Sequence, residues 1–222
     1  MAPPPGNPYH GARLAGWAGL ACPPAAAALL LAAGRLTPGY DAVRTTVSHL
    51  GQRGQPYALA VNLAFAALGL TAIAVALALD RSLRARGRAG WPLVLAGLAL
   101  VGVAFVSRDP VRPVPHRVVA LVLFLALLLA PAVAARCLRR DPAWVAFSAP
   151  SLAAAALSLA LLLAGAAGVV HGGLPAGAWE RTFVGVDLLW LMAVSAGLLR
   201  ARTSLPHGAG TFPPPQGGRE GG

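Results

Sequence analysis

The residues that could carry out chemistry in this chain gather in three short polar segments between long apolar stretches. These segments are residues 37–56, 107–116 and 171–181. The side chains in them that could bind or react, and that we take as candidates, are Asp41, Arg44, Ser48, Arg108, Asp109, His116, Glu180 and Arg181. Carboxylates and imidazoles hold metal ions, hydroxyls act as nucleophiles, and arginines bind phosphate with paired hydrogen bonds. We therefore expect any functional site to lie where the three segments meet.

One hypothesis is a metal-dependent membrane hydrolase that acts on a lipid or another amphiphile. His49, Asp109, His116 and His171 could supply nitrogen and oxygen ligands to zinc, with Ser48 or a metal-bound water as the nucleophile. The spacing matches no zinc motif, because the chain has neither HExxH nor a histidine pair at helical spacing. A phosphate-binding GxGxxG turn is also absent, so no metal and no cofactor is assigned.

A second hypothesis, of a different class, is binding of lipid headgroups or of a membrane partner. Arg44, Arg108, Arg112 and Arg181 would offer forked donors to phosphate groups, which demands less of the geometry than catalysis does. A small-solute transporter is a third possibility. It rests only on Asn62 and Asp187, the polar residues that stand out within the apolar stretches.

The elements that position these residues must be membrane-spanning helices. Hydrophobic residues make up 57% of the 222 residues and charged residues only 11%, against about 25% in ordinary soluble domains. A helix needs about 20 apolar residues to cross the hydrocarbon core. Six stretches qualify or come close, and the third is the shortest: 14–33, 57–79, 91–106, 118–135, 144–170 and 182–199. The composition predicts an all-α membrane protein with a bundle of six transmembrane helices.

The distribution of arginine predicts the orientation of this bundle. All basic residues are arginines, and eleven of the eighteen fall in the amino-terminal arm, the second and fourth connections and the carboxyl tail. Because cytoplasmic loops carry the excess of positive charge, both termini are expected in the cytoplasm of a multi-pass protein of the cell membrane. Arg84 should then be cytoplasmic and Arg112 should not. Trp17, Trp91 and Trp144 open odd-numbered stretches, where a cytoplasmic aromatic belt would lie.

Composition and charge also predict the domain boundaries and the classes of molecule that the protein would bind. Residues 13–202 form the membrane domain, while the Pro- and Gly-rich segments 1–12 and 203–222 are expected to be disordered cytoplasmic arms. Membrane lipids are the expected partners. Nucleic acid is not, because the arginines are spread between apolar stretches and form no basic patch. A protein partner or an oligomeric state does not follow from the sequence.

The first outer connection has the pattern of a short helix at the membrane surface. Asp41 is a good helix N-cap and Gly51 can end the helix. One face would carry Val43, Val47 and Leu50, and the other would carry Asp41, Arg44 and Ser48. This pattern predicts an interfacial helix whose polar face points toward the other outer loops.

Four of the candidates are expected to converge at the outer face. Asp109 and His116 would be held close by the prolines between them, and Glu180 and Arg181 would begin the sixth helix on the same side. The arrangement could be an ion-pair clasp between the third, fourth and sixth helices, or a headgroup or metal site. Asp187 is expected to face the bundle, because a lipid-facing carboxylate costs about 2.5–3.5 kcal/mol on insertion scales.

Several of these segments resemble a known family. They are YDAVRTTVSHLG, PYALAVNLAFAALGL with Asn62 and Gly69, SRDP followed by His116, and ER with a downstream LLW. This pattern is similar to the DUF998 family, a domain of unknown function in bacterial six-helix membrane proteins. The resemblance covers about residues 14–200. It implies the fold and a membrane location, and it implies no established activity.

Overall fold

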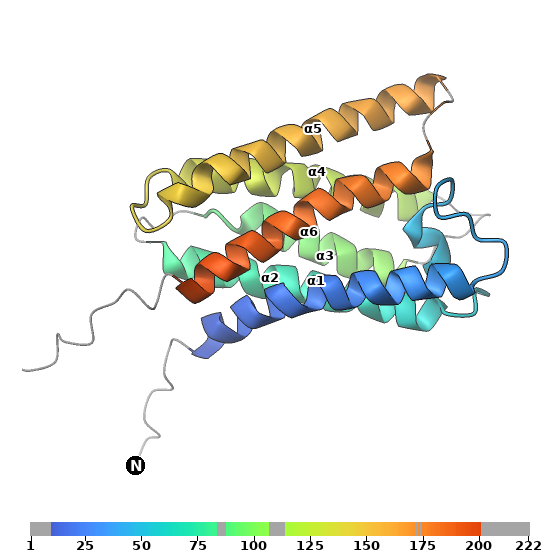
Figure 1. The fold of residues 1–222 in the computed structure, drawn as a ribbon, viewed down its shortest axis with the longest axis horizontal. Coiled ribbons are helices and arrows are strands. Elements are labelled where there is room, and N and C mark those ends of the chain that lie inside the picture. Colours follow the sequence, from blue (N-terminus) through green and yellow to red (C-terminus); the bar gives the residue numbers. More distant parts are fainter. Residues whose placement is uncertain (1–9, 84–87, 107–113, 172, 174, 201–222) are drawn as a thin grey trace, which may run out of the picture.

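The computed structural model describes residues 10–83, 88–106, 114–171, 173 and 175–200. This part of the chain is helical, and its six α-helices run along one long axis (Figure 1). In chain order they are α1 (His10–Leu36), α2 (Ala58–Ser82), α3 (Trp91–Phe105), α4 (Val114–Leu138), α5 (Ser148–His171) and α6 (Ala176–Arg200). Two short 3₁₀ helices accompany them, η1 (Val47–Gly51) and η2 (Val145–Phe147). The expectation of an all-α fold is confirmed.

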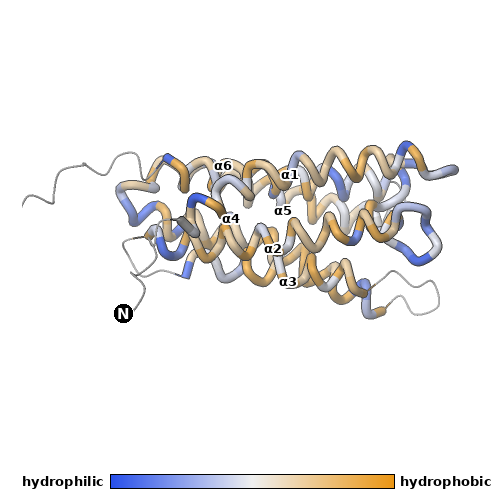
Figure 2. The backbone as a smooth tube through the Cα atoms, turned by 90° about the horizontal axis from the view of Figure 1, so that it is seen from below, coloured by the Kyte–Doolittle hydropathy of each residue, from blue (hydrophilic) through white to orange (hydrophobic). Residues whose placement is uncertain are grey.

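The helices form a closed ring in which each packs against its neighbours in sequence. α1 to α5 follow one another around the ring, and α6 returns to contact α1. We call the end of the bundle that carries η1 the outer end, and the end with the start of α1 and the end of α6 the inner end. Figure 2 shows hydrophobic residues along the helices and polar residues gathered near the two ends.

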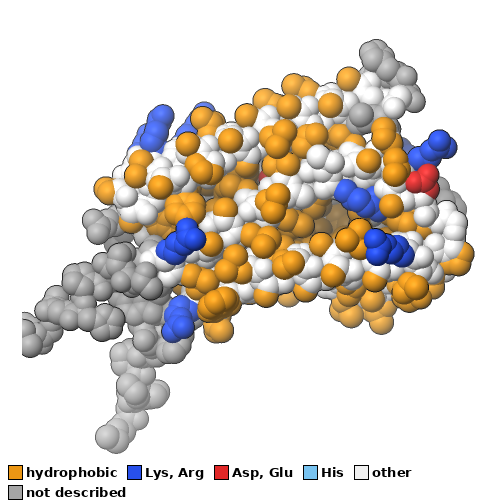
Figure 3. All heavy atoms as spheres, in the orientation of Figure 1, with side chains coloured by type: hydrophobic (Ala, Val, Ile, Leu, Met, Phe, Trp, Pro, Cys, Tyr) orange, Lys and Arg blue, Asp and Glu red, His pale blue; other side chains and the backbone are white. Residues whose placement is uncertain are grey.

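Length and composition agree with a multi-pass membrane protein. Within the described ranges, five helices are long and apolar enough to cross a bilayer, and α3 is a shorter apolar helix of 15 residues. At 1.5 Å per residue α3 spans about 22 Å, less than the roughly 30 Å of a typical hydrocarbon core. Large apolar side chains also cover the outside of the bundle (Figure 3), as lipid contact requires: for example Leu59, Leu70, Leu98, Phe105, Leu152, Leu163 and Leu189.

Small residues allow the closest helix contacts. A Cβ atom on Gly97 of α3 would lie 2.5 Å from the carbonyl oxygen of Gly69 in α2, and a Cβ on Gly69 would lie equally close to the Gly97 oxygen. On the other side of the ring, Gly16 and Gly19 of α1 pack against Ser195 of α6. Backbones can approach this closely only where no side chain intervenes. These contacts fix α2 against α3 and the inner half of α1 against α6.

The inner half of the bundle is solidly packed. Its largest fully buried side chains include Leu79, Leu138, Leu198 and Trp144, which belong to one apolar cluster. Trp144 was expected in an aromatic belt, but only 1% of it is exposed, because its ring packs on Phe147 and over Gly197. The expectation for Trp144 is therefore wrong. Trp17 and Trp91 are exposed, as a belt requires.

The first outer connection is not the single helix that its pattern predicted. Asp41 caps one turn, in which its Oδ1 accepts from the backbone N–H groups of Val43 and Arg44. The chain is then extended at Thr46 and turns into the 3₁₀ helix η1. The β-branched run from Thr45 to Val47 disfavours continuous α-helix. Leu50 is buried as expected, whereas Val43 is more than half exposed.

Candidate functional site

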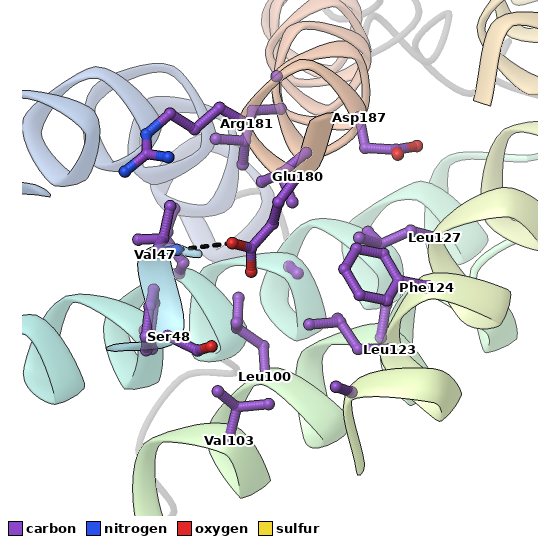
Figure 4. A pocket seen from close by; sticks show the side chains of 18 of the residues that line it. Val47, Ser48, Leu100, Val103, Leu123, Phe124, Leu127, Glu180, Arg181 and Asp187 are labelled. Atoms are coloured by element: carbon purple, nitrogen blue, oxygen red, sulfur yellow. Dashed lines mark hydrogen bonds between the residues drawn. The ribbon is translucent and has the colours of Figure 1, made fainter. Parts of the chain in front are cut away.

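A cavity of about 310 Å³ lies inside the ring, in its outer and middle parts. Its volume falls at the lower end of the range for small-molecule sites. Side chains from α1, η1, α2, α3, α4 and α6 line it, and most of them are apolar (Figure 4). The apolar lining includes Leu30, Leu31, Phe65, Leu68, Leu100, Val103, Leu123, Phe124, Leu127 and Leu188.

The polar side chains of the cavity come from η1, α4 and α6. Ser48, His116, Glu180 and Arg181 belong to its outer part, and Asp187 lies two helical turns further along α6. Figure 4 shows the Glu180 carboxylate reaching into the space between the helices, while the Arg181 side chain extends toward η1 and α1. The cavity therefore combines apolar walls with a few polar groups, as ligand sites commonly do.

Glu180 joins the start of α6 to the outer connection. Its Oε2 accepts a hydrogen bond of 2.6 Å from the backbone N–H of Val47, the first residue of η1. Two residues earlier in α6, the N–H of Ala178 donates to the carbonyl oxygen of Val43 at 2.9 Å. Backbone groups of a connection that leaves regular structure need such partners. The first turns of α6 therefore supply hydrogen-bond partners to backbone groups of Val43 and Val47, which a continuous helix over 41–51 would have paired internally.

Arg181 completes this attachment with several hydrogen bonds. Its Nη1 donates to the carbonyl oxygens of Ala42 at 2.5 Å and Thr45 at 3.2 Å, and to Gly177 at 2.8 Å in its own helix. Its Nη2 donates to the hydroxyl of Tyr40, and its guanidinium carbon lies 5.6 Å from the centre of the Tyr40 ring. A guanidinium is suited to this role because its donors point in fixed directions in one plane.

We call these contacts of Glu180 and Arg181 with residues 40–47 the loop clasp. Gly177 is necessary for it, because a Cβ atom there would lie 2.5 Å from the carbonyl oxygen of Ala42. The Tyr40 hydroxyl accepts from Arg181 and lies 3.2 Å from the carbonyl oxygens of Thr45 and Thr46, to which it donates. Burial raises the pKa of Tyr40 above its ordinary value, which keeps the donating proton on the phenol.

His116 lies at the cavity wall and contacts the end of α3. Its Nδ1 lies 2.9 Å from the carbonyl oxygen of Val106 at the end of α3. A carbonyl can only accept, so Nδ1 carries the proton, and in the neutral imidazole Nε2 is left as an acceptor. The side chain is 8% exposed and lines the cavity. His116 thus connects α3 to α4 and presents an imidazole to the enclosed space.

Asp187 is buried in the middle of the bundle, as expected for a carboxylate in a membrane helix. Only 3% of the residue is exposed. Ser158 of α5 donates to its Oδ2 at 3.3 Å, and Oδ1 has no hydrogen-bond partner among the described residues. A buried polar atom without a partner is uncommon in folded proteins and calls for an explanation.

The cavity reaches the surface of the bundle between α1 and α6. These helices touch through Gly16 and Gly19 at the inner end and diverge toward the outer end (Figure 1). The space-filling view shows a hollow between them in the outer half (Figure 3). Ala27 and Leu31 of α1 and Gly185 of α6 border the cavity and are partly or largely exposed. The opening therefore faces sideways, toward the region that lipid would occupy.

Comparison with known proteins places this chain in a family. The profile of one family, described as a protein of unknown function (DUF998), matches residues 20–197. The chain belongs to the DUF998 family. No curated protein and no solved structure matches it. The matched region contains every residue that lines the cavity, from Ala27 to Leu191.

In this DUF998 protein, the candidate residues divide into three groups. Ser48, His116, Glu180, Arg181 and Asp187 line one cavity. Asp41 and Arg44 form an exposed ion pair of 3.7 Å outside it. Arg108 and Asp109 lie outside the described residues, as do Arg84 and Arg112, which were chosen to mark the orientation.

The contacts of these residues differ from the clasp that the sequence suggested. The expected clasp would have joined the third, fourth and sixth helices, whereas the hydrogen bonds of Glu180 and Arg181 described above join α6 to residues 40–47. Asn62 donates from Nδ2 to the carbonyl oxygen of Gly51 at 3.0 Å, so it fixes the end of η1 to α2. Across the described ranges, no group of three His, Cys, Asp or Glu side chains is placed to share a metal ion.

Sequence reasoning did not find Gly185, which lines the DUF998 cavity, or two residues that lie outside it and contact its charged side chains. Tyr40 and Ser158 were missed, although each is a polar residue whose partner is a charged candidate. Gly185 was missed as well. Its place one helical turn after Arg181 was the available signal.

Proposed function

We propose that this protein binds a membrane amphiphile in its central cavity. The apolar part of the ligand would lie against the leucine and phenylalanine side chains of α1 to α4. Its polar group would contact the polar side chains that η1, α4 and α6 contribute. The observation that carries the proposal is the combination of an apolar cavity of about 310 Å³, a few polar groups from η1, α4 and α6, and a sideways opening between α1 and α6 (Figure 3).

The inner half of the bundle favours binding over transport. A cavity for a transported solute needs a polar route to the other side of the membrane. Here the residues inward of Trp190 and Leu191 are packed apolar side chains such as Val75, Leu79 and Val194, each no more than 1% exposed. The cavity is therefore a pocket with one closed end, which suits a bound ligand.

The location of the protein is part of the proposal. We place it in the cell membrane with six spans, both termini in the cytoplasm and the cavity open toward the outer leaflet. The arginine excess at the inner end supports this orientation. α3 would cross a locally thinned bilayer, because short apolar helices are accommodated in this way.

Cysteine labelling tests the orientation. In a variant without Cys22 and Cys137, we expect Arg53→Cys to react with a membrane-impermeant maleimide on whole cells and Arg139→Cys to react only after permeabilisation. Both native side chains are exposed, one in the outer connection and one after α4, so access to reagent does not depend on unfolding. Labelling of position 139 alone on intact cells would show that the orientation is reversed.

A cavity-filling substitution tests the binding. Gly185 lines the cavity, and a Cβ atom there would meet no heavy atom within 4 Å, so Gly185→Phe can place its ring in the open space. We expect this variant to bind decanol and decylamine, two single-chain amphiphiles, at least tenfold more weakly than the wild-type chain. Native mass spectrometry of detergent-purified protein measures the bound amphiphile.

The control is the same substitution at Gly11, which is also unhindered but lies at the start of α1, away from the cavity. Gly11→Phe should bind both amphiphiles as the wild-type chain does. Equal binding by Gly185→Phe and Gly11→Phe would contradict a ligand in the cavity.

A further inference from the structure

The unpaired oxygen of Asp187 indicates what kind of polar group the cavity takes. Asp187 is one of the residues that line the cavity, and 97% of it is buried. Figure 4 shows its carboxylate turned away from Glu180, and its hydrogen-bond partner Ser158 belongs to α5. Oδ2 of Asp187 accepts one hydrogen bond from Ser158, while Oδ1 has no partner among the described residues. In the ionised side chain both oxygens only accept hydrogen bonds, so the partner that Oδ1 lacks in this form is a donor.

The depth of Asp187 favours a donor that also carries positive charge. A carboxylate at the centre of a membrane helix is costly, and such residues commonly have an ionic partner. One hydrogen bond from a neutral hydroxyl offsets little of that cost. An ammonium group would supply both the hydrogen bond and the opposite charge.

The rest of the cavity agrees with a cationic ligand. Phe124 and Trp190 line it, and aromatic ring faces attract ammonium groups. Glu180 adds a second carboxylate to the cavity, two helical turns nearer its outer end, and Figure 4 shows the two carboxylates pointing in different directions. Arg181, which could have attracted an anion, uses its guanidinium in the loop clasp.

From these observations we infer that the ligand is a lipophilic amine whose ammonium group binds at Asp187 and whose apolar chain fills the rest of the cavity. This inference rests on the proposed function, because it requires that the cavity binds an amphiphile. It adds that an amine is selected over an alcohol and over a carboxylate with the same chain.

Three amphiphiles that share a ten-carbon backbone test the selectivity: decylamine, decanol and decanoate. Each is titrated into detergent-purified full-length protein, and the bound fraction is measured by native mass spectrometry. We expect the wild-type chain to bind decylamine at least tenfold more tightly than decanol, and decanoate most weakly. Asp187→Asn should lower the affinity for decylamine to that for decanol and leave decanol binding unchanged, which also shows that the variant is folded.

Two further variants complete the test. Asp80→Asn alters a carboxylate at the inner end of α2 that accepts from the Gly90 N–H, outside the cavity, and should not change the preference. Ser158→Ala keeps the Asp187 carboxylate and removes its donor, so the amine preference should persist. Equal affinity of the wild-type chain for decylamine and decanol, or an unchanged preference in Asp187→Asn, would overturn the assignment of an amine. If none of the three amphiphiles binds the wild-type chain, the proposed function itself fails.

Discussion

Arg181→Ala is expected to lower the free energy of unfolding by about 2–4 kcal/mol. The guanidinium donates to three backbone carbonyls and to Tyr40, and alanine replaces none of these hydrogen bonds. Hydrogen bonds from charged groups contribute more than neutral ones. The carbonyl oxygen of Ala42 would lose its Arg181 donor, and that of Thr45 would keep only the Tyr40 hydroxyl. The variant should also release residues 40–47 from α6, so that proteases cut this connection faster.

Two variants serve as comparisons in detergent unfolding experiments. Arg44→Ala removes an arginine from the same connection, but its side chain is 86% exposed and Asp41 is its ion-pair partner among the described residues, so it should change stability by less than about 1 kcal/mol. Arg181→Lys keeps the charge and should retain part of the stability, because one ammonium cannot reproduce the planar set of donors. Equal stabilities of Arg181→Ala and Arg44→Ala would show that the loop clasp contributes little.

Gly97→Val is expected to destabilise the bundle by about 3 kcal/mol or more, because it forces α2 and α3 apart. A Cβ atom at Gly97 would lie 2.5 Å from the Gly69 carbonyl oxygen and 2.7 Å from Cγ1 of Ile73. The first of these is backbone, which cannot rotate away as a side chain could. Because α3 lines the cavity, a displaced α3 should also weaken amphiphile binding.

Gly185→Val provides the matched control for this substitution. It adds the same atoms to another helix of the bundle, at a position where a Cβ meets nothing within 4 Å. Its unfolding midpoint should stay close to that of the wild-type chain, while that of Gly97→Val falls sharply. Similar midpoints for the two variants would mean that the α2–α3 contact is looser than the structure shows.

The helices could be predicted because the physical signal for them is strong. Each of the six apolar stretches contains a helix, and the stretch at 91–106 is also the shortest helix, Trp91–Phe105. The ends were less predictable. α4 begins at Val114 rather than near residue 118, since Pro115 is tolerated in a first turn and polar residues there can remain helical. Hydropathy predicts which residues of a helix are apolar enough to contact lipid. It does not predict where the helix ends, because the helix can continue into polar residues.

The site was predictable only in part, because the sequence reveals side chains and not their backbone partners. Glu180, Arg181 and Asp187 were identified from their charge and position. Their partners include the carbonyl oxygens of Ala42 and Thr45 and the N–H of Val47, groups that every residue carries. The apolar lining has no signature either, because its leucines resemble those that face lipid. Which of them enclose a cavity depends on how the ring closes.

The position of the proline pair in α1 determines how the opening beside α6 can change. Pro23 and Pro24 lie inside α1, between the part that is packed through Gly16 and Gly19 and the part that diverges from α6. Neither proline has an N–H to donate to the turn before it, so α1 lacks two hydrogen bonds there and bends at a lower cost than elsewhere. The outer half of α1 can therefore move relative to the inner half by bending of the helix at these two prolines. The width of the opening can vary while the inner ends of α1 and α6 stay in contact.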